Sequence, residues 1–344
     1  MHRKTVRLAA LAASAIVLAG CSAAEAEPAT SDSGAPEAAA EATTITLYTS
    51  EPQEKIDEII SAFNEQRPEI TVEVFRAGTG DLTARIESER VAGEVQADVL
   101  LAADAPTFEG YAADGLLAEL DVADVDALDP AVLDAEDYYV GTRIIPTVIA
   151  YNTDMVDSPP TSWQELTDPS YANQLVMPNP DVSGAAAFNA AVWLDDQQLG
   201  EEWMTALAAN EPVIVDSNGP TSQAIASGAQ PVGVVVDYLV RDLAAAGSPI
   251  AVSYPEEGVP FVSQPAGIFS SSDDVEASQA FIDFLVSAEG QAIAVEQAYL
   301  PVRGDVGTPE GAPEMSDIAL LNPDLEVIAE TKADAVATFN ALFQ

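Results

Sequence analysis

Apolar and polar positions follow two different periods along the chain, and their order predicts alternating strands and helices. Apolar side chains alternate over residues 45–50, which is typical of a β-strand, and recur with the spacing of one helix face over residues 53–66. Pro68 ends this helix, because a proline ring cannot continue it. Residues 72–104 then predict a second strand, a glycine-rich turn, a helix and a buried third strand.

This βαβαβ order is typical of an open sheet with helices on both faces. In such sheets, ligands bind at the carboxyl ends of the strands. The residues that follow the three predicted strands are therefore expected to line one crevice: Thr49, Ser50, Glu51, Thr79, Gly80, Ala103 and Asp104.

The turn before the second predicted helix has two interpretations. Gly78 and Gly80 allow backbone N–H groups to approach a ligand, and the helix start adds positive potential. The segment is therefore either a binding site for a small anion or polar solute, or a plain tight turn.

A second helix start of this kind precedes the helix predicted over 187–193. Asp181 or Ser183 can cap that helix, which leaves the N–H groups of Gly184 and Ala185 free to face a ligand. A purely structural cap is the alternative.

Two more junctions follow along the chain. Pro220 suits the first turn of a helix, and Asn218, Gly219 and Thr221 beside it can donate to ligand oxygens. A buried strand predicted over 232–236 is followed directly by two polar residues that we add to the candidate site, Asp237 and Tyr238.

The first 21 residues predict a targeting signal. Basic residues come first, an apolar run from Leu8 to Leu18 follows, and Ala19-Gly20-Cys21 closes the segment. The run is too short to span a membrane. Its ending resembles the bacterial lipobox, so we expect a signal peptide over 1–20 and a lipid on Cys21 that anchors the protein to the outer face of the cell membrane. An ordinary secretory signal with a chance cysteine is the alternative.

Residues 21–43 predict an acidic tether without structure of its own. After the cysteine the segment holds small, acidic and proline residues, with no aromatic or large aliphatic side chain, so it cannot bury a core. Cys21 is the only cysteine, which excludes an internal disulfide.

The charge of the chain and its histidine content exclude several classes of partner and of catalysis. The net charge is −45, and loss of Arg3, Lys4 and Arg7 with the signal makes it −48. Such a field repels nucleic acids and anionic lipid headgroups, which we exclude as partners. The single histidine, His2, also leaves with the signal, so Ser-His-Asp and Cys-His catalysis and histidine-ligated metals are excluded in the mature protein.

Five separated motifs carry a resemblance to a known family. From residue 45 to about residue 305, the chain is similar to extracellular solute-binding proteins of ABC importers, in the group that includes binders of ferric iron, aminoethylphosphonate and sugar phosphates. The motifs cover residues 138–156, 159–193, 225–243, 254–258 and 277–291.

The resemblance implies an α/β fold of the two-lobe periplasmic-binding-protein type II, in which each lobe is a mostly parallel sheet flanked by helices. Chain crossings near Pro146 and Val262 would make lobe 1 from 43–145 plus 263–344 and lobe 2 from 146–262. It also favours the binding interpretation of the glycine turn, with Thr79 and Gly80 facing Ser183, Asn218 and Tyr238 across the hinge.

The implied ligand is a small polar solute, and we favour an organic phosphonate or phosphate ester. Arg76 and Arg143 lie at junctions near the expected crevice, whereas Arg85 has the spacing of a surface pair with Asp81, and Arg241 is expected to face solvent. Glu257 either contacts an amine of the ligand or belongs to a turn.

Ferric iron is the alternative ligand. Tyr238 stands where the family's iron binders place two adjacent tyrosines, but Leu239 follows it here, so only one phenolate is expected as a metal ligand. Pro52 and Ala103 replace the histidine and the glutamate of the iron binders. These departures weaken the ferric hypothesis, because Fe(III) prefers several anionic oxygens at once.

Together these features predict a monomeric lipoprotein that closes two lobes around a solute and delivers it to ABC permease subunits. We expect no cofactor and no catalysis. The alternative from another class is a secreted enzyme that uses paired carboxylates, which a chain with 57 acidic residues does not exclude.

Overall fold

The computed structural model describes residues 42–321 and 323–344. The predicted signal peptide, Cys21 and nearly all of the predicted tether lie outside these residues. Within the described ranges, no helix is both long enough and apolar enough to cross a bilayer.

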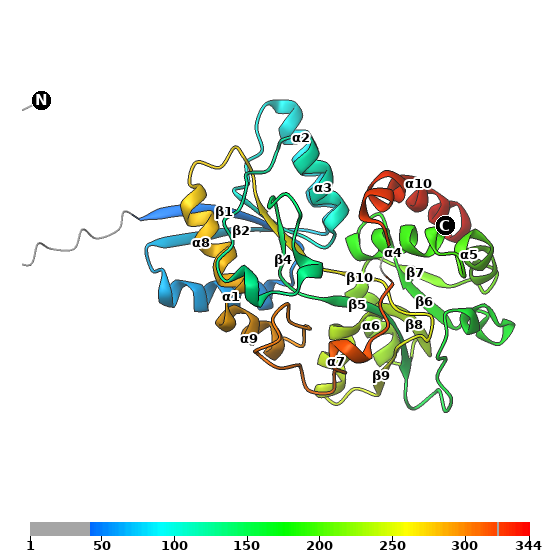
Figure 1. Cartoon of the computed structure of the whole chain (residues 1–344). Helices are drawn as coiled ribbons and strands as arrows, with labels where there is room; N and C mark the ends of the chain where they lie inside the picture. Colours follow the sequence, from blue (N-terminus) through cyan, green and yellow to red (C-terminus); the bar gives the residue numbers. More distant parts are fainter. Residues whose placement is uncertain (1–41, 322) are drawn as a thin grey trace, which may run out of the picture. The chain divides into compact units, whose positions relative to one another are not determined.

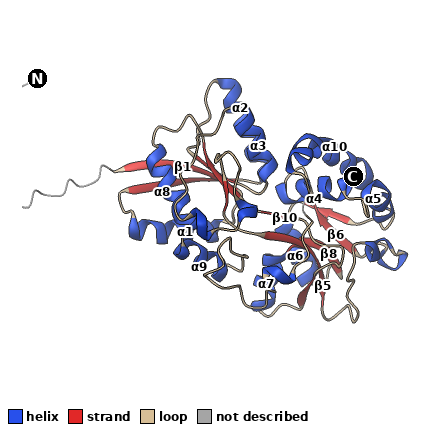
Figure 2. Ribbon diagram, in the orientation of Figure 1, coloured by secondary structure: helices blue, strands red, loops and turns tan. Residues whose placement is uncertain are grey.

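The first sheet has five strands in the order β2-β1-β3-β11-β4 (Figures 1 and 2). Its strands are β1 (Thr43–Thr49), β2 (Ile70–Arg76), β3 (Val99–Leu101), β4 (Val140–Gly141) and β11 (Pro265–Ile268). The α-helices of the same segments are α1 (Gln53–Gln66), α2 (Thr79–Ala92), α3 (Ala105–Ala113), α8 (Val275–Val286) and α9 (Ala288–Glu296). The strand–helix order predicted for residues 45–104 is confirmed.

The second sheet has six strands, with β10-β5-β8-β6-β7 in order and β9 paired to β5. These strands are β5 (Ile145–Asn152), β6 (Leu175–Pro178), β7 (Val213–Val215), β8 (Val232–Val236), β9 (Ile250–Ser253) and β10 (Phe261–Val262). The helices of this part are α4 (Gly184–Asp195), α5 (Gly200–Ala208), α6 (Asn218–Ala226) and α7 (Asp237–Ala245). The chain passes between the sheets in the short segments 142–144 and 263–264.

Both sheets are mixed, where we expected mostly parallel ones. β1 pairs with β2 and β3 in parallel, and β6 pairs with β7 and β8 in parallel. β11, however, is antiparallel to β3 and β4, and β5 is antiparallel to β8, β9 and β10. The antiparallel pairings belong to strands next to the crossings, where the chain enters or leaves a sheet without a connecting βα unit.

Several large apolar side chains of the helices are buried. Trp193 and Trp203 are 2% and 3% exposed and pack with their ring centroids 5.6 Å apart. Phe281 and Leu285 of α8 are likewise buried, and the Phe281 ring meets Phe63 of α1 edge to face at 5.2 Å. Phe281 and Leu285 are four residues apart, so they lie on one face of α8, and this face is buried.

The C-terminal helix α10 (Leu325–Phe343) contacts helices from the segments of both sheets. It packs against α4 and α5 as well as α3, and Figure 1 shows it beside α4 and α5. Our assignment of all of 263–344 to the first lobe did not foresee this. The sequence pattern marks the buried face of a helix, but it does not name the element that covers that face.

Candidate functional site

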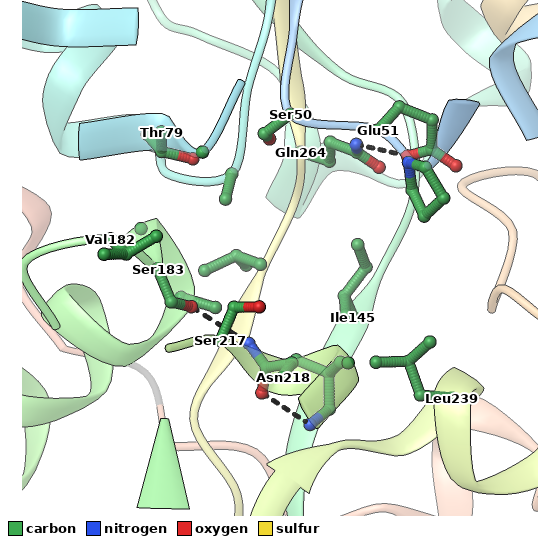
Figure 3. A pocket seen from close by; sticks show the side chains of 18 of the residues that line it. Ser50, Glu51, Thr79, Ile145, Val182, Ser183, Ser217, Asn218, Leu239 and Gln264 are labelled. Atoms are coloured by element: carbon green, nitrogen blue, oxygen red, sulfur yellow. Dashed lines mark hydrogen bonds between the residues drawn. The ribbon is translucent and has the colours of Figure 1, made fainter. Parts of the chain in front are cut away.

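The candidate site is a cavity of about 760 Å³ lined by residues that follow strands of both sheets. We call it the central cavity (Figure 3). This volume is in the range typical of small-molecule sites. Most of the predicted site residues line it, namely Ser50, Glu51, Gly78, Thr79, Ser183, Gly184, Ala185, Asn218, Gly219 and Tyr238.

Several helices begin at the central cavity. The first turns of α2, α6 and α7 carry no side-chain cap in the described part of the chain. The leading N–H groups of a helix have no partner within the helix, and its N-terminus carries a partial positive charge. These three starts therefore give the cavity backbone donors and a positive potential, which suits an anion or a polar oxygen.

The start of α4 is organised differently. Ser183 caps the helix by accepting a hydrogen bond from the Ala186 N–H at 3.3 Å, so Ser183, and not Asp181, is the cap. The Asn218 amide donates to Ser183 Oγ at 2.9 Å and accepts from the Val236 N–H at 3.2 Å (Figure 3). Asn218 therefore links the starts of α4 and α6 to the end of β8.

Two glycine-containing loops meet beside the cavity. The Gly80 N–H donates to the Val182 carbonyl at 3.4 Å, and a Cβ on Gly80 would lie 2.1 Å from the Asp181 carbonyl oxygen. A Cβ on Gly184 would lie 2.8 Å from Thr79 Cβ. Only glycine permits this approach, so Gly80 acts here in the contact between the loops and does not line the cavity.

Glu51 is held by a buried network. Its carboxylate, in a residue that is 1% exposed, accepts from Gln264 Nε2 at 2.6 Å, from the Tyr299 hydroxyl at 2.7 Å and from Arg143 Nη1 at 3.3 Å. Arg143 and Gln264 come from the two segments that connect the sheets. The charges of Glu51 and Arg143 therefore offset each other inside the protein.

Arg76 is the basic residue that lines the cavity. Its Nε donates to the Glu51 backbone carbonyl at 3.2 Å, which fixes the side chain at the end of β2. None of the ion pairs among the described residues involves Arg76. Its guanidinium charge is therefore available to a ligand, although Asp81 and Asp216 also line the cavity.

Tyr299 is a cavity residue that the sequence analysis missed. Its ring lies beside that of Tyr238, with centroids 4.2 Å apart. Burial, together with the nearby Glu51 carboxylate, raises the pKa of both hydroxyls, so both are protonated at neutral pH. Tyr299 follows α9, more than sixty residues after Tyr238, and no local pattern indicates that the two meet.

The remaining predicted site residues do not line the cavity. The Thr49 hydroxyl accepts from the Glu51 N–H at 3.0 Å, and the Thr221 hydroxyl donates to the Ser217 carbonyl at 2.9 Å. Asp104 caps α3 through the Thr107 N–H at 2.9 Å and pairs with Lys332 Nζ at 2.7 Å. Each of these polar groups is turned into the protein to satisfy a backbone or charged partner.

Asp237 also does not line the cavity. Its partner is Arg241, which we expected to face solvent. Arg241 is 8% exposed and does not face solvent. Its Nη1 donates to Asp237 at 2.6 Å, and its Nη2 donates to the Ala298 carbonyl at 2.7 Å. The i, i+4 spacing of the two residues on α7 permits this buried pair.

Side-chain contacts decide two other predictions, the partner of Arg85 and the role of Glu257. Arg85 pairs with Glu89 at 2.7 Å and not with Asp81. Glu257 belongs to a turn, because its carboxylate accepts from Ser162 Oγ and from the N–H of Trp163. Burial by itself would raise the pKa of Glu257, but these hydrogen bonds lower it below its ordinary value.

No group of three or more His, Cys, Asp or Glu side chains is placed to hold a metal ion within the described ranges. Tyrosine oxygens are a further class of iron ligand, and Tyr238 and Tyr299 bring such oxygens to the cavity.

Comparison with known proteins gives the family. A family model described as "Bacterial extracellular solute-binding protein" matches residues 58–319, which is most of the chain. The chain belongs to this family. It is accordingly an extracytoplasmic solute-binding protein of the ABC-transporter type, a class of binding proteins rather than enzymes.

Relatives of this solute-binding protein have been named for phosphonate binding. A Salmonella paratyphi A protein with the name "Putative 2-aminoethylphosphonate-binding periplasmic protein" is 28% identical over 256 residues, which cover 69% of this chain and 71% of the relative. A protein of the same name from Salmonella typhimurium is 27% identical over the same length.

Solved structures of similar fold bind different ligands. Iron-bound HitA from Pseudomonas aeruginosa has a TM-score of 0.77 at 23% identity, with 88% of this chain and 100% of that chain covered. AfuA from Actinobacillus pleuropneumoniae, with fructose-6-phosphate bound, has a TM-score of 0.80 at 20% identity, with 88% and 98% covered. These likenesses establish the two-lobe α/β periplasmic-binding-protein fold for this solute-binding protein.

Proposed function

We propose that this solute-binding protein is a lipid-anchored receptor that captures an organic phosphonate or phosphate ester in the central cavity and delivers it to an ABC permease. The observation that carries the ligand assignment is the position of Arg76. Its guanidinium lines the cavity without an ion-pair partner in the described ranges, close to the uncapped start of α2. A guanidinium and helix N–H groups together match the several oxygens of a phosphonate.

The acidic residues of the cavity fit a zwitterionic version of this ligand. Asp81 and Asp216 line the same cavity as Arg76. A carboxylate accepts hydrogen bonds from an amine, so these side chains suit a cationic group on the same molecule. The names of the Salmonella relatives are consistent with such a ligand.

Lobe closure around the ligand is part of the proposal. Lobe 1 is 43–145 with 263–344, and lobe 2 is 146–262, with α10 in contact with both. A ligand that touches both lobes stabilises the closed arrangement, because its contacts are complete only there. The anchor would be Cys21, and the receptor would act as a monomer.

The test is a calorimetric titration of the purified protein with 2-aminoethylphosphonate, ethylphosphonate and ferric citrate. Arg76→Gln is expected to weaken phosphonate binding by about tenfold to hundredfold, because a charge-assisted hydrogen bond contributes about 1.5–3 kcal/mol. Arg67→Gln is the matched control, since Arg67 pairs with Glu69 and its side chain is 42% exposed. Equal affinity of the two variants would contradict the role of Arg76.

Ferric iron remains a second candidate because of one specific observation, the contact of Tyr238 with Tyr299 in the cavity. The pair supplies the second phenol that the sequence alone did not offer. Against it, the Tyr299 hydroxyl already donates to Glu51, and iron would have to displace two protons whose pKa values are raised. Binding of ferric citrate alone in the same titration, with a visible charge-transfer band that Tyr238→Phe removes, would establish iron instead.

A further inference from the structure

The central cavity has one polar side and one apolar side. Hydroxyls and an amide are contributed by Ser50, Thr79, Ser183, Ser217 and Asn218. A second part of the lining, which we call the apolar wall, is made by Ile145, Val236, Tyr238, Leu239 and Val262, and Asn218 borders this wall because its amide oxygen accepts from the Val236 N–H. Figure 3 shows Thr79 and Ser183 on one side of the cavity and Ile145 and Leu239 on the other.

The strand backbone of the apolar wall has few hydrogen-bonding groups to offer, so the free backbone donors of the wall are those of the first turn of α7. Ile145 and Val262 face each other as partners in the antiparallel pairing of β5 with β10. Val236 is paired with Thr147 in β8, and its N–H donates to the Asn218 amide oxygen. Since these strands use their backbone groups for pairing, the Tyr238 hydroxyl is the side-chain polar group of the wall.

We infer that the ligand of this cavity carries, beside its charged groups, a short apolar segment that packs against the apolar wall. The inference rests on the proposed function and specifies its ligand. A sugar phosphate would place several hydroxyls against Ile145, Leu239 and Val262, where most of them would lose water without gaining a partner. An alkyl chain loses no hydrogen bond there and gains burial.

The apolar wall lies beside the two segments that connect the sheets, so the size of the ligand affects the contacts made there. Ile145 begins the strand that follows the first crossing between the sheets, and Val262 ends the strand that precedes the second. Both side chains are nearly buried, at 6% and 4% exposure, so they form a fixed surface. A substituent that fills the space beside them contacts both crossing strands at once.

The experiment measures the affinity of the purified protein for methyl-, ethyl- and propylphosphonate and for fructose 6-phosphate by calorimetry. Affinity is expected to rise about fourfold for each added methylene, and propylphosphonate is expected to bind more tightly than fructose 6-phosphate. In Ile145→Thr, which places a hydroxyl in the wall, the gain from methyl- to propylphosphonate should fall to less than about half of the value for the unchanged protein.

Two variants keep the result interpretable. Val213→Thr makes a similar change on strand β7, at a residue that is 43% exposed and does not line the cavity, and should keep the full gain. Ile145→Val keeps the wall apolar and should keep most of the gain if Ile145→Thr does not fold.

The outcomes distinguish failure of the apolar subsite from failure of the proposed function. Equal affinities along the alkyl series, or tighter binding of fructose 6-phosphate, would overturn the apolar subsite and leave the proposed anion site standing. Failure of every phosphorus compound to bind would overturn both the subsite and the proposed function.

Discussion

At the scale of single residues, the polar side chains divide into those that face the cavity and those that hold the protein together. Glu51 lines the cavity, yet its carboxylate is occupied by Gln264, Tyr299 and Arg143. Arg76, anchored on the Glu51 backbone carbonyl, keeps its charge free of ion pairs in the described ranges. A charge in the cavity lining is therefore available to a ligand only where no protein group already neutralises it.

This division predicts a large stability cost for Glu51→Gln. The substitution leaves the Arg143 guanidinium buried without its carboxylate, which typically costs about 3–5 kcal/mol. The free energy of unfolding, measured by urea denaturation, should fall by about that amount. Glu54→Gln, an exposed glutamate on the neighbouring helix, should change it by less than about 0.5 kcal/mol. Similar losses in the two variants would show that the network does not stabilise the fold.

At the scale of elements, α10 links segments that follow strands of the two sheets. Lys332 pairs with Asp104, which follows β3, and Asn340 donates to Asp181, which follows β6. Buried Ala335 and Phe339 pack the same helix against the protein. Asp104 and Asp181, which the sequence suggested as a ligand contact and a helix cap, thus serve the attachment of the C-terminal helix.

We expect Lys332→Gln to lower the free energy of unfolding by about 2 kcal/mol. Asp104 is 1% exposed and would lose its only ion pair in the described ranges, while Lys332 is only partly buried, so the cost is below that of a fully buried pair. Thermal unfolding followed by circular dichroism measures the change. Arg67→Gln, which breaks an exposed pair, provides the comparison and should have little effect. An equally small effect of Lys332→Gln would mean that the hydrophobic face alone attaches α10.

At the scale of the whole molecule, like charges dominate the electrostatics. The chain has 57 acidic and 12 basic side chains, so most carboxylates have no cation to pair with. Mutual repulsion of these carboxylates opposes the compact state. The positive potential of the helix starts and of Arg76 is therefore a local feature inside a strongly negative protein.

Added salt should stabilise this molecule. Raising NaCl from about 0.01 M to 1 M shortens the screening length from about 30 Å to about 3 Å and weakens the repulsion. The unfolding midpoint at pH 7 is expected to rise by roughly 2–5 °C, as scanning calorimetry would show. Near the sequence pI of about 4.1 the net charge vanishes, and the same salt step should have little effect. A lower midpoint at pH 7 in high salt would indicate that ion pairs outweigh the repulsion.

Local patterns in the sequence were enough to locate the helix starts of the site. Each lies at a strand-to-helix junction, and the local pattern of apolar residues, glycines and capping side chains fixes such junctions over a few residues. Ser50, Thr79, Ser183 and Asn218 were found in this way, and all of them line the central cavity. The family could likewise be recognised from the sequence, because its motifs are local.

Which polar groups are free depends, in contrast, on contacts between distant parts of the chain. Asp104, Asp237 and Thr49 have the right positions along the chain, but their side chains turn to partners inside the protein. Tyr299 joins Tyr238 from a segment far along the chain, and α10 packs on both parts of the fold. The physical reason is that hydrogen bonds and ion pairs satisfy buried groups through long-range contacts, and these depend on packing that no local pattern encodes.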